Sequence, residues 1–140
     1  VLIDEAREGK LVDALVESAS AMYPTMLDND DYTSVVNDRH HARLTSYIED
    51  AKAKGADITI VNPAGEDFAS ANGRKMPLHI IRNTSDDMKV MQEEIFGPLL
   101  PIRRVRSTDE AVDFVNSRDR PLGLYYFGKD AAEESRVLDR

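Results

Sequence analysis

The chain has no cysteine among its 140 residues. This absence excludes disulfide bonds, thiolate metal sites and a cysteine nucleophile within these residues. The chain also has no apolar run near the roughly 18 to 20 residues that a membrane-spanning helix needs, and no basic region followed by an apolar one opens it as in a secretory signal. We therefore expect no association with membranes and a cytoplasmic location.

Positive charge is scarce as well. The 18 Lys and Arg residues are outnumbered by 26 Asp and Glu residues, which gives a formal net charge of -8 at pH 7. Nucleic-acid binding relies on clustered Lys and Arg side chains. The densest basic cluster is Arg103, Arg104 and Arg106, which we interpret as a solvated rim at a strand edge. Nucleic acid is therefore not predicted as a partner.

The sequence lacks the common nucleotide-binding and hydrolase motifs. Its glycines are scattered, so neither G-x-G-x-x-G nor a Walker loop occurs, and no G-x-S-x-G turn is present. A self-contained dinucleotide site of the Rossmann type is therefore absent from this chain.

No metal site is predicted either. His40 and His41 are neighbours that diverge by about 100° on a helix, and His79 stands alone in a predicted strand. The acidic loop that begins at Asp28 is not a calcium loop, because Tyr32 occupies the place of an oxygen ligand. A solvated turn is the better interpretation of that loop.

The hydrophobic pattern is typical of a soluble α/β chain. Hydrophobic residues make up 41% and charged residues 31% of it. Helical and strand periodicity alternate, which predicts a largely parallel sheet flanked by helices. Helices are predicted over 7–22, 38–54, 107–116 and 131–140, one helical turn over 88–91, and strands over 57–61, 78–81, 99–105 and 123–127. The chain begins at Val1 inside an apolar, strand-like run without an initiator Met, and it ends in a helical pattern without a Gly or Pro stop signal. We therefore expect a piece of a longer protein.

The segment Gln92–Pro98 combines carboxylates with an aromatic residue before a Gly-Pro stop. Residues i and i+2 share a face in extended chain, so Glu94 and Phe96 can point the same way. A carboxylate suits the vicinal hydroxyls of a ribose, and a flat apolar ring suits a nicotinamide. Glu93 faces the opposite way, so the two glutamates are not an acid–base pair. From the residues alone, a solvated loop charge is the favoured interpretation of either glutamate.

The same segment, Glu-Glu-Ile-Phe-Gly-Pro, resembles the signature of the NAD(P)-dependent aldehyde dehydrogenases. Val36–His40 resembles the Asn-x-Arg-His segment of the branch with the class 3, fatty-aldehyde and coniferyl-aldehyde enzymes. Residues 21–34 look like the bacterial coniferyl-aldehyde type, and residues 106–111 and 121–127 also look like that branch. The resemblance covers the 140 residues in family order.

This resemblance implies that residues 1–140 are one segment of an aldehyde dehydrogenase catalytic domain. The segment would follow the nucleophilic cysteine, with the NAD-binding domain and the C-terminal oligomerisation segment outside it. Glu94 would bind the nicotinamide ribose hydroxyls and Phe96 would pack beside the nicotinamide of NAD or NADP, with the choice between the two nucleotides left open. Glu93 inherits no such role, and no catalytic residue falls within the chain.

In the family reaction, a cysteine thiolate attacks the aldehyde, hydride passes to NAD(P)+, and the thioester is hydrolysed. The resemblance thus implies a parent enzyme, a homodimer or homotetramer, that oxidises an aromatic, coniferyl-type aldehyde to its acid. The 140 residues alone are predicted to be inactive. The alternative is a free-standing, non-catalytic α/β interaction module. A cysteine-bearing segment upstream in the gene would distinguish the enzyme from the module.

Overall fold

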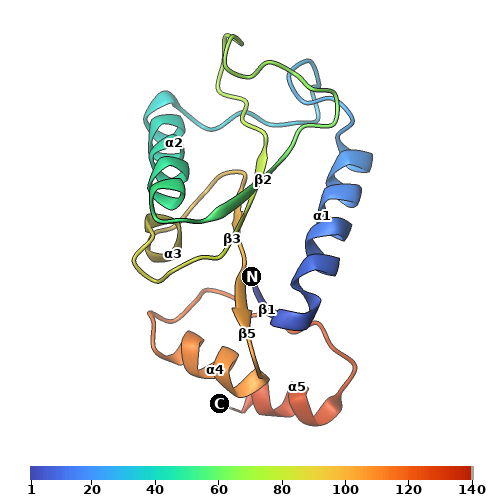
Figure 1. Cartoon of the computed structure of the whole chain (residues 1–140), viewed down its shortest axis with the longest axis vertical. Helices are drawn as coiled ribbons and strands as arrows, with labels where there is room; N and C mark the ends of the chain where they lie inside the picture. The colour runs from blue at the N-terminus through green and yellow to red at the C-terminus, as the bar shows by residue number, and fades with distance from the viewer. Residues whose placement is uncertain (140) are drawn as a thin grey trace.

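The computed structural model describes residues 1–139, which form two small sheets with helices around them (Figure 1). One sheet has the strand order β2–β3–β4 and the other pairs β1 with β5. In chain order the elements are β1 Leu2–Asp4, the 3-10 turn η1 Glu5–Arg7, α1 Glu8–Met22, α2 Asp38–Ala53, β2 Asp57–Val61, β3 Leu78–Arg82, α3 Lys89–Gln92, β4 Leu99–Pro101, β5 Arg103–Val105, α4 Thr108–Asn116 and α5 Ala131–Leu138.

The predicted α/β class, with helices flanking the sheets, is confirmed. The pairs β3–β4 and β1–β5 are parallel, whereas β2 and β3 are antiparallel, with Ile58 opposite Ile81. β2 and β3 are joined by a loop without a helix, and such a connection suits antiparallel neighbours, since parallel strands need a crossover.

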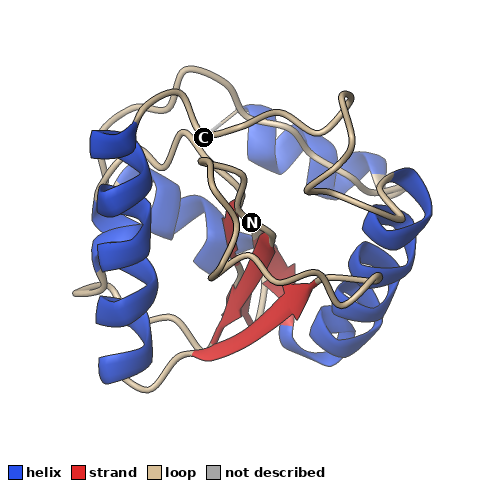
Figure 2. Cartoon of the chain, turned by 90° about the horizontal axis from the view of Figure 1, so that it is seen from above, coloured by secondary structure: helices blue, strands red, loops and turns tan. Residues whose placement is uncertain are grey.

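The three-stranded sheet is covered on both faces, by α2 with α3 on one side and by α1 on the other (Figures 1 and 2). Successive side chains of a strand point to opposite faces, so β3 serves two cores. Ile81 packs in the cluster of α2 and α3, and Ile80 packs in the cluster of α1; both are fully buried. Burying each side chain contributes about 1.5–3 kcal/mol of hydrophobic stabilisation. The sheet therefore fixes α2 in place.

Side-chain caps explain where the helices begin. The Asn37 side chain accepts a hydrogen bond from the His40 N–H at 2.9 Å and starts α2. The Ser107 hydroxyl likewise accepts from the Glu110 N–H at 3.2 Å and starts α4. The Glu110 carboxylate reaches back to the N–H of Arg106, at 2.9 Å, and not to that of Ser107. The residues Ser-Thr-Asp-Glu at 107–110 fit the capping-box pattern, and the structure has its first bond, but the return bond is shifted by one residue.

The prediction of one strand over residues 99–105 is wrong. β4 and β5 belong to different sheets, and Ile102 lies between them with a fully buried side chain. The Ile102 N–H donates to the Ile81 carbonyl at 2.8 Å. The chain bends there because β4 pairs with β3, whereas β5 pairs with β1.

The predicted strand over residues 123–127 is also not formed. Within the described part of the chain no strand lies beside this segment, so its backbone groups have no ladder to join. Leu122, Tyr125 and Phe127 are exposed there. The predicted last helix corresponds to α5, which ends at Leu138; Arg140 lies outside the described residues.

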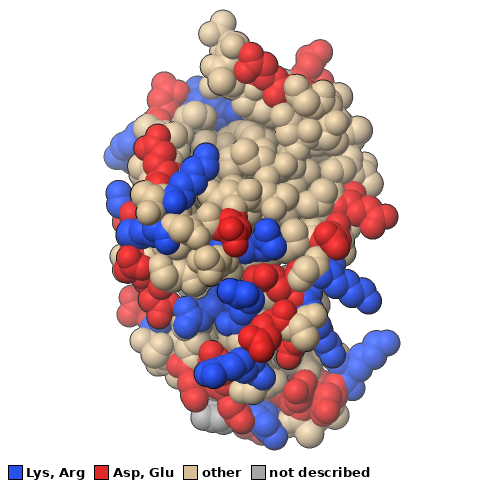
Figure 3. Space-filling model, viewed as in Figure 1, with Lys and Arg blue, Asp and Glu red and all other residues tan. Residues whose placement is uncertain are grey.

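Charges of both signs are interspersed over the molecular face in Figure 3. Arg104 pairs with Glu8 at 3.9 Å and Arg106 with Glu110 at 3.1 Å, and both arginines lie at the surface as expected. Arg103 differs, because its guanidinium is stacked on the Phe114 ring. No helix in the described part of the chain is long and apolar enough to cross a bilayer.

Candidate nucleotide-binding site

An open pocket of about 550 Å³ lies between the first turns of α2 and the loop that follows α3. Its lining residues are His40, Arg43, Glu93, Glu94 and Phe96. The structure therefore brings Glu94 and Phe96 to one pocket, beside residues that come from α2.

Arg43 connects α2 to this loop. Its guanidinium donates hydrogen bonds to the carbonyl oxygens of Glu94, at 2.6 Å, and Ile95, at 2.7 Å. A third bond runs to the Tyr47 hydroxyl at 2.8 Å, one helical turn further along α2. Because the planar guanidinium has several donors in fixed directions, it holds two consecutive peptide units of the loop at once.

The loop also makes close backbone contact with α2. Phe96 has a φ of 51°, a left-handed conformation that is uncommon for a residue with a side chain. A Cβ atom on Gly97 would lie 2.3 Å from Cδ1 of the buried Leu44, so glycine is required at this position. The Pro98 carbonyl then accepts from the His79 N–H of β3 at 2.8 Å. These contacts hold the loop in one conformation.

Glu94 and Phe96 present unused groups to the pocket. Among the described residues, no hydrogen bond or ion pair engages the Glu94 carboxylate, whereas its backbone carbonyl is held by Arg43. The Phe96 side chain is 69% exposed. A free acceptor next to an exposed ring has the chemistry needed to bind a diol and an aromatic ring.

Glu93 has a different environment. Its carboxylate accepts a hydrogen bond from the Tyr47 hydroxyl at 2.5 Å. Burial raises the pKa of Tyr47 above its ordinary value, the hydrogen bond to Glu93 raises this pKa further, and Arg43 opposes the shift. Tyr47 is 2% exposed and belongs to the hydrophobic cluster between α2 and the three-stranded sheet, so Glu93 is hydrogen-bonded to a core residue. Glu93 thus lines the pocket with a carboxylate that is already bound to Tyr47.

Sequence reasoning missed the part of α2 in this site. From the sequence, His40 was considered only as a metal ligand, which was rejected, and as part of the family resemblance. Arg43 was not considered. His40, Arg43 and Tyr47 are spaced by three and four residues, which places them on one helical face. That spacing is the available signal; the Arg43–Glu94 contact, which spans 51 residues, is not visible in local sequence.

The family model described as "Aldehyde dehydrogenase family" matches residues 1–140. Over 133 residues the chain is 53% identical to a "Probable coniferyl aldehyde dehydrogenase" of Caulobacter vibrioides, covering 92% of the chain and 27% of that relative. It is 47% identical over 140 residues to a "Coniferyl aldehyde dehydrogenase" of Pseudomonas sp. strain HR199, covering 100% of the chain and 29% of that relative. The chain therefore spans less than a third of the length of these relatives.

Solved structures of aldehyde dehydrogenases resemble this chain in fold. The substrate-bound AldH of Staphylococcus aureus superposes with a TM-score of 0.83 at 33% identity, over 99% of this chain and 29% of that one. A betaine aldehyde dehydrogenase of the same organism, solved with NAD+, gives 0.76 at 27% identity over 99% of this chain and 28% of that one. An NADP-dependent glyceraldehyde-3-phosphate dehydrogenase of Bacillus halodurans, solved with NADP, gives 0.68 at 25% identity over 85% and 24%. With its match over residues 1–140 and its relatives above 30% identity, this chain belongs to the aldehyde dehydrogenase family.

Proposed function

We propose that this chain forms the nicotinamide-ribose part of the nucleotide site of an aldehyde dehydrogenase, with Glu94 and Phe96 as the nucleotide-binding residues. The observation that carries the proposal is their placement in one pocket. There the Glu94 carboxylate has no partner among the described residues and the Phe96 ring is exposed, while Arg43 holds the backbone of the loop.

The nucleotide, NAD+ or NADP+, supplies the hydride acceptor of the family reaction. Glu94 would accept hydrogen bonds from vicinal ribose hydroxyls, which restricts rotation of the attached ring. Phe96 would cover one side of that ring and exclude water from it. Arg43 would keep both groups oriented before the nucleotide arrives, because its two carbonyl contacts fix the peptide planes that carry them.

The substrate we propose for the whole protein is an aromatic, coniferyl-type aldehyde, which is oxidised to the carboxylic acid. The names of the relatives from Caulobacter and Pseudomonas support this choice. Since these 140 residues hold no cysteine, the nucleophile would come from a segment of the catalytic domain that precedes them. The NAD-binding domain and an oligomerisation segment would complete a cytoplasmic homodimer or homotetramer.

The test uses the full-length protein. Reduction of NAD+ and of NADP+ is followed by absorbance with coniferyl aldehyde and, separately, with a simple aliphatic aldehyde. Reduction with coniferyl aldehyde at the higher kcat/KM supports the proposal and identifies the nucleotide. A preference for the aliphatic aldehyde would keep the reaction but replace the substrate. A folded protein that reduces neither nucleotide with either aldehyde would favour the non-catalytic module instead.

A further inference from the structure

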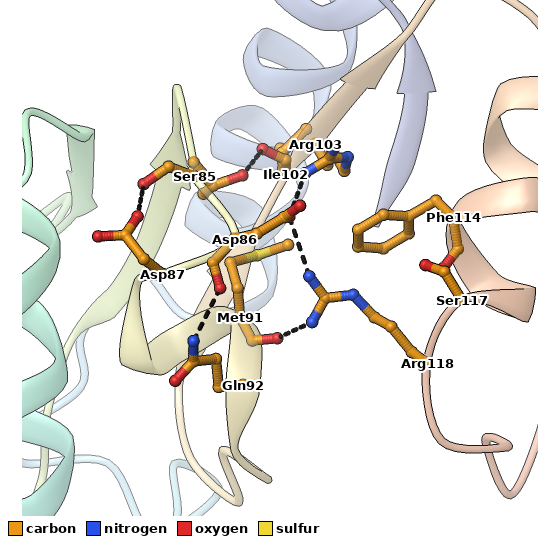
Figure 4. Close-up of polar contacts among 11 residues, drawn as sticks. Ser85, Asp86, Asp87, Met91, Gln92, Ile102, Arg103, Phe114, Ser117 and Arg118 are labelled. Atoms are coloured by element: carbon orange, nitrogen blue, oxygen red, sulfur yellow. Dashed lines mark hydrogen bonds and ion pairs between the residues drawn. The ribbon is translucent and has the colours of Figure 1, made fainter.

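A second polar cluster lies just before α3, whereas the loop that carries Glu94, here called the Glu94 loop (residues 93–98), follows α3. Asp86, which precedes α3, binds two arginines through one carboxylate oxygen: Arg103 of β5 at 2.5 Å and Arg118, just after α4, at 2.9 Å (Figure 4). The Phe114 ring is contacted by both guanidiniums, with Cζ atoms 4.2 Å and 4.4 Å from its centroid. We call these four residues the Asp86 cluster.

The Asp86 cluster is a strong connection between distant parts of the chain. One carboxylate forms ion pairs with two guanidiniums, and each guanidinium gains a cation–π contact with Phe114. The side chains of Arg103 and Arg118 are 25% and 30% exposed, whereas that of Asp86 is 58% exposed, so solvent screens the ion pairs and the geometry of the shared contacts matters more than their charge. The cluster therefore ties β5 and α4 to the turn before α3.

Arg118 extends this connection to α3 itself. Its second terminal nitrogen donates to the Met91 carbonyl at 2.8 Å (Figure 4). Met91 lies in the last turn of α3, where carbonyls have no helical partner. The Gln92 side chain adds a bond to the Asp86 carbonyl at 3.0 Å. A helix of four residues depends on such tertiary contacts, and the Asp86 cluster supplies two of them at the end of α3.

The Glu94 loop begins where α3 ends. Met91 is three residues before Glu94, and the loop is next held by Arg43 at the Glu94 and Ile95 carbonyls. Two arginines, Arg43 and Arg118, thus hold backbone carbonyls on either side of Glu93. The bonds of Tyr47 to Glu93 and of His79 to the Pro98 carbonyl also hold this segment. Loss of the Arg118 contacts would therefore free only the backbone from Met91 to Glu94, and with it the position of the Glu94 carboxylate in the pocket.

We propose that Arg118 is a positioning residue for the nucleotide site, acting through the Met91 carbonyl and the Asp86 carboxylate to fix the Glu94 loop. This inference rests on the proposed function of Glu94. It assigns to Arg118, two residues beyond the end of α4 and outside the pocket, a role in how tightly and in what orientation the nucleotide is held.

The first experiment compares full-length Arg118→Met with the unchanged protein. Methionine keeps an unbranched stem beside Phe114 but removes the donors to Met91 and Asp86. We expect the Kd for the nucleotide, by isothermal titration calorimetry, to rise about tenfold, and the KM for the aldehyde to change by less than about twofold. The control Arg106→Met removes an exposed ion pair with Glu110 and should leave both constants unchanged.

A double-mutant cycle separates positioning from general loosening of the fold. If Arg118 acts through Glu94, the Arg118→Met effect on nucleotide Kd should shrink to within about twofold in a Glu94→Gln background. Equal effects in both backgrounds would overturn the inference. Arg118→Lys, which keeps the charge but not the paired donors, should lie between the unchanged protein and Arg118→Met, and carries the same test if Arg118→Met does not fold.

The outcomes distinguish this inference from the function on which it rests. If Glu94→Gln weakens the nucleotide but neither Arg118 variant does, the positioning role is wrong and the function of Glu94 stands. If Glu94→Gln leaves nucleotide Kd and the hydride step unchanged, the proposed site is wrong, and the positioning role fails with it.

Discussion

Glu93 and Glu94 are neighbours with different surroundings. The Glu93 carboxylate accepts a hydrogen bond from Tyr47, whereas the Glu94 carboxylate lines the pocket without a partner among the described residues. Both residues line the pocket, but α2 binds the carboxylate of Glu93 and only the backbone carbonyl of Glu94. The left-handed φ of Phe96 departs from the extended chain that the sequence suggested, and the partner of Glu93, 46 residues away, has no local sequence signal.

This difference leads to a prediction for Glu94→Gln in the full-length protein. Removing the charge weakens hydrogen bonds from ribose hydroxyls, so we expect the hydride step to slow by about 10- to 100-fold. Single-turnover absorbance measurements report that step directly. Glu93→Gln is the matched control, because an amide oxygen can still accept from Tyr47 and the rate should stay within about twofold. Equal single-turnover rates for Glu94→Gln and the unchanged protein would contradict the assignment.

His79 predicts a pH dependence of stability. Burial lowers the pKa of His79 below its ordinary 6.5, and the hydrogen bond to the Pro77 carbonyl only partly opposes this. The unfolded chain therefore binds a proton at a higher pH than the folded one, so the free energy of unfolding decreases as pH falls below 6.5 toward the folded pKa. In chemical denaturation from pH 7.5 to 5, His79→Gln should show a smaller decrease. The same slope in both proteins would rule out this contribution.

At the scale of elements, Gly97 sets how closely the loop approaches α2. The Gly97→Ala methyl group would lie 2.3 Å from Leu44, whose side chain is fully buried and would have to shift within the core. We expect a loss of about 1–3 kcal/mol in the free energy of unfolding, together with weaker nucleotide binding. Thermal unfolding and calorimetry measure the two effects.

Gly9→Ala in α1 is the matched control. No atom lies within 4 Å of a Cβ at Gly9, so alanine should be neutral or stabilise the protein by up to about 1 kcal/mol. Gly97→Ala and Gly9→Ala proteins of equal stability would show that the approach of the loop to α2 is not tight.

The elements that sequence predicted well are those with a local signal. Asn37 and Ser107 supply caps, and the apolar stripe of α2 recurs at helical spacing, so both helices were placed within about one residue. The strands over 99–105 and 123–127 failed for a different reason. A strand exists only where a partner offers its backbone groups, and the partner is set by the whole fold and not by the segment.

At the scale of the whole molecule, the segment after α4 exposes apolar side chains without a covering element. Tyr125 and Phe127 are 83% and 92% exposed, and Leu122 is fully exposed. Exposed apolar surface of this kind marks an interaction surface or an aggregation liability. The relatives are more than three times longer than this chain, and we propose that residues outside it cover this surface.

We therefore predict that the isolated 140 residues bind a hydrophobic dye such as ANS more strongly than the full-length protein, and that they do not oxidise aldehydes. The second expectation follows from the absence of any cysteine, without which no thioester can form. Fluorescence and nucleotide absorbance check the two statements. Turnover of aldehyde by the isolated chain at enzyme-like rates would disprove the cysteine mechanism for this protein.

The pairing of β1 with β5 has a consequence for how the chain is made. Leu2 pairs with Arg103, so the two strands are about 100 residues apart in sequence. A ribosome releases β1 long before β5, and β1 must stay unpaired while α1, α2 and the three-stranded sheet assemble. Contacts of such large separation slow folding, since a long loop must close before they form. β1 is therefore expected to be among the last elements protected from hydrogen exchange during refolding.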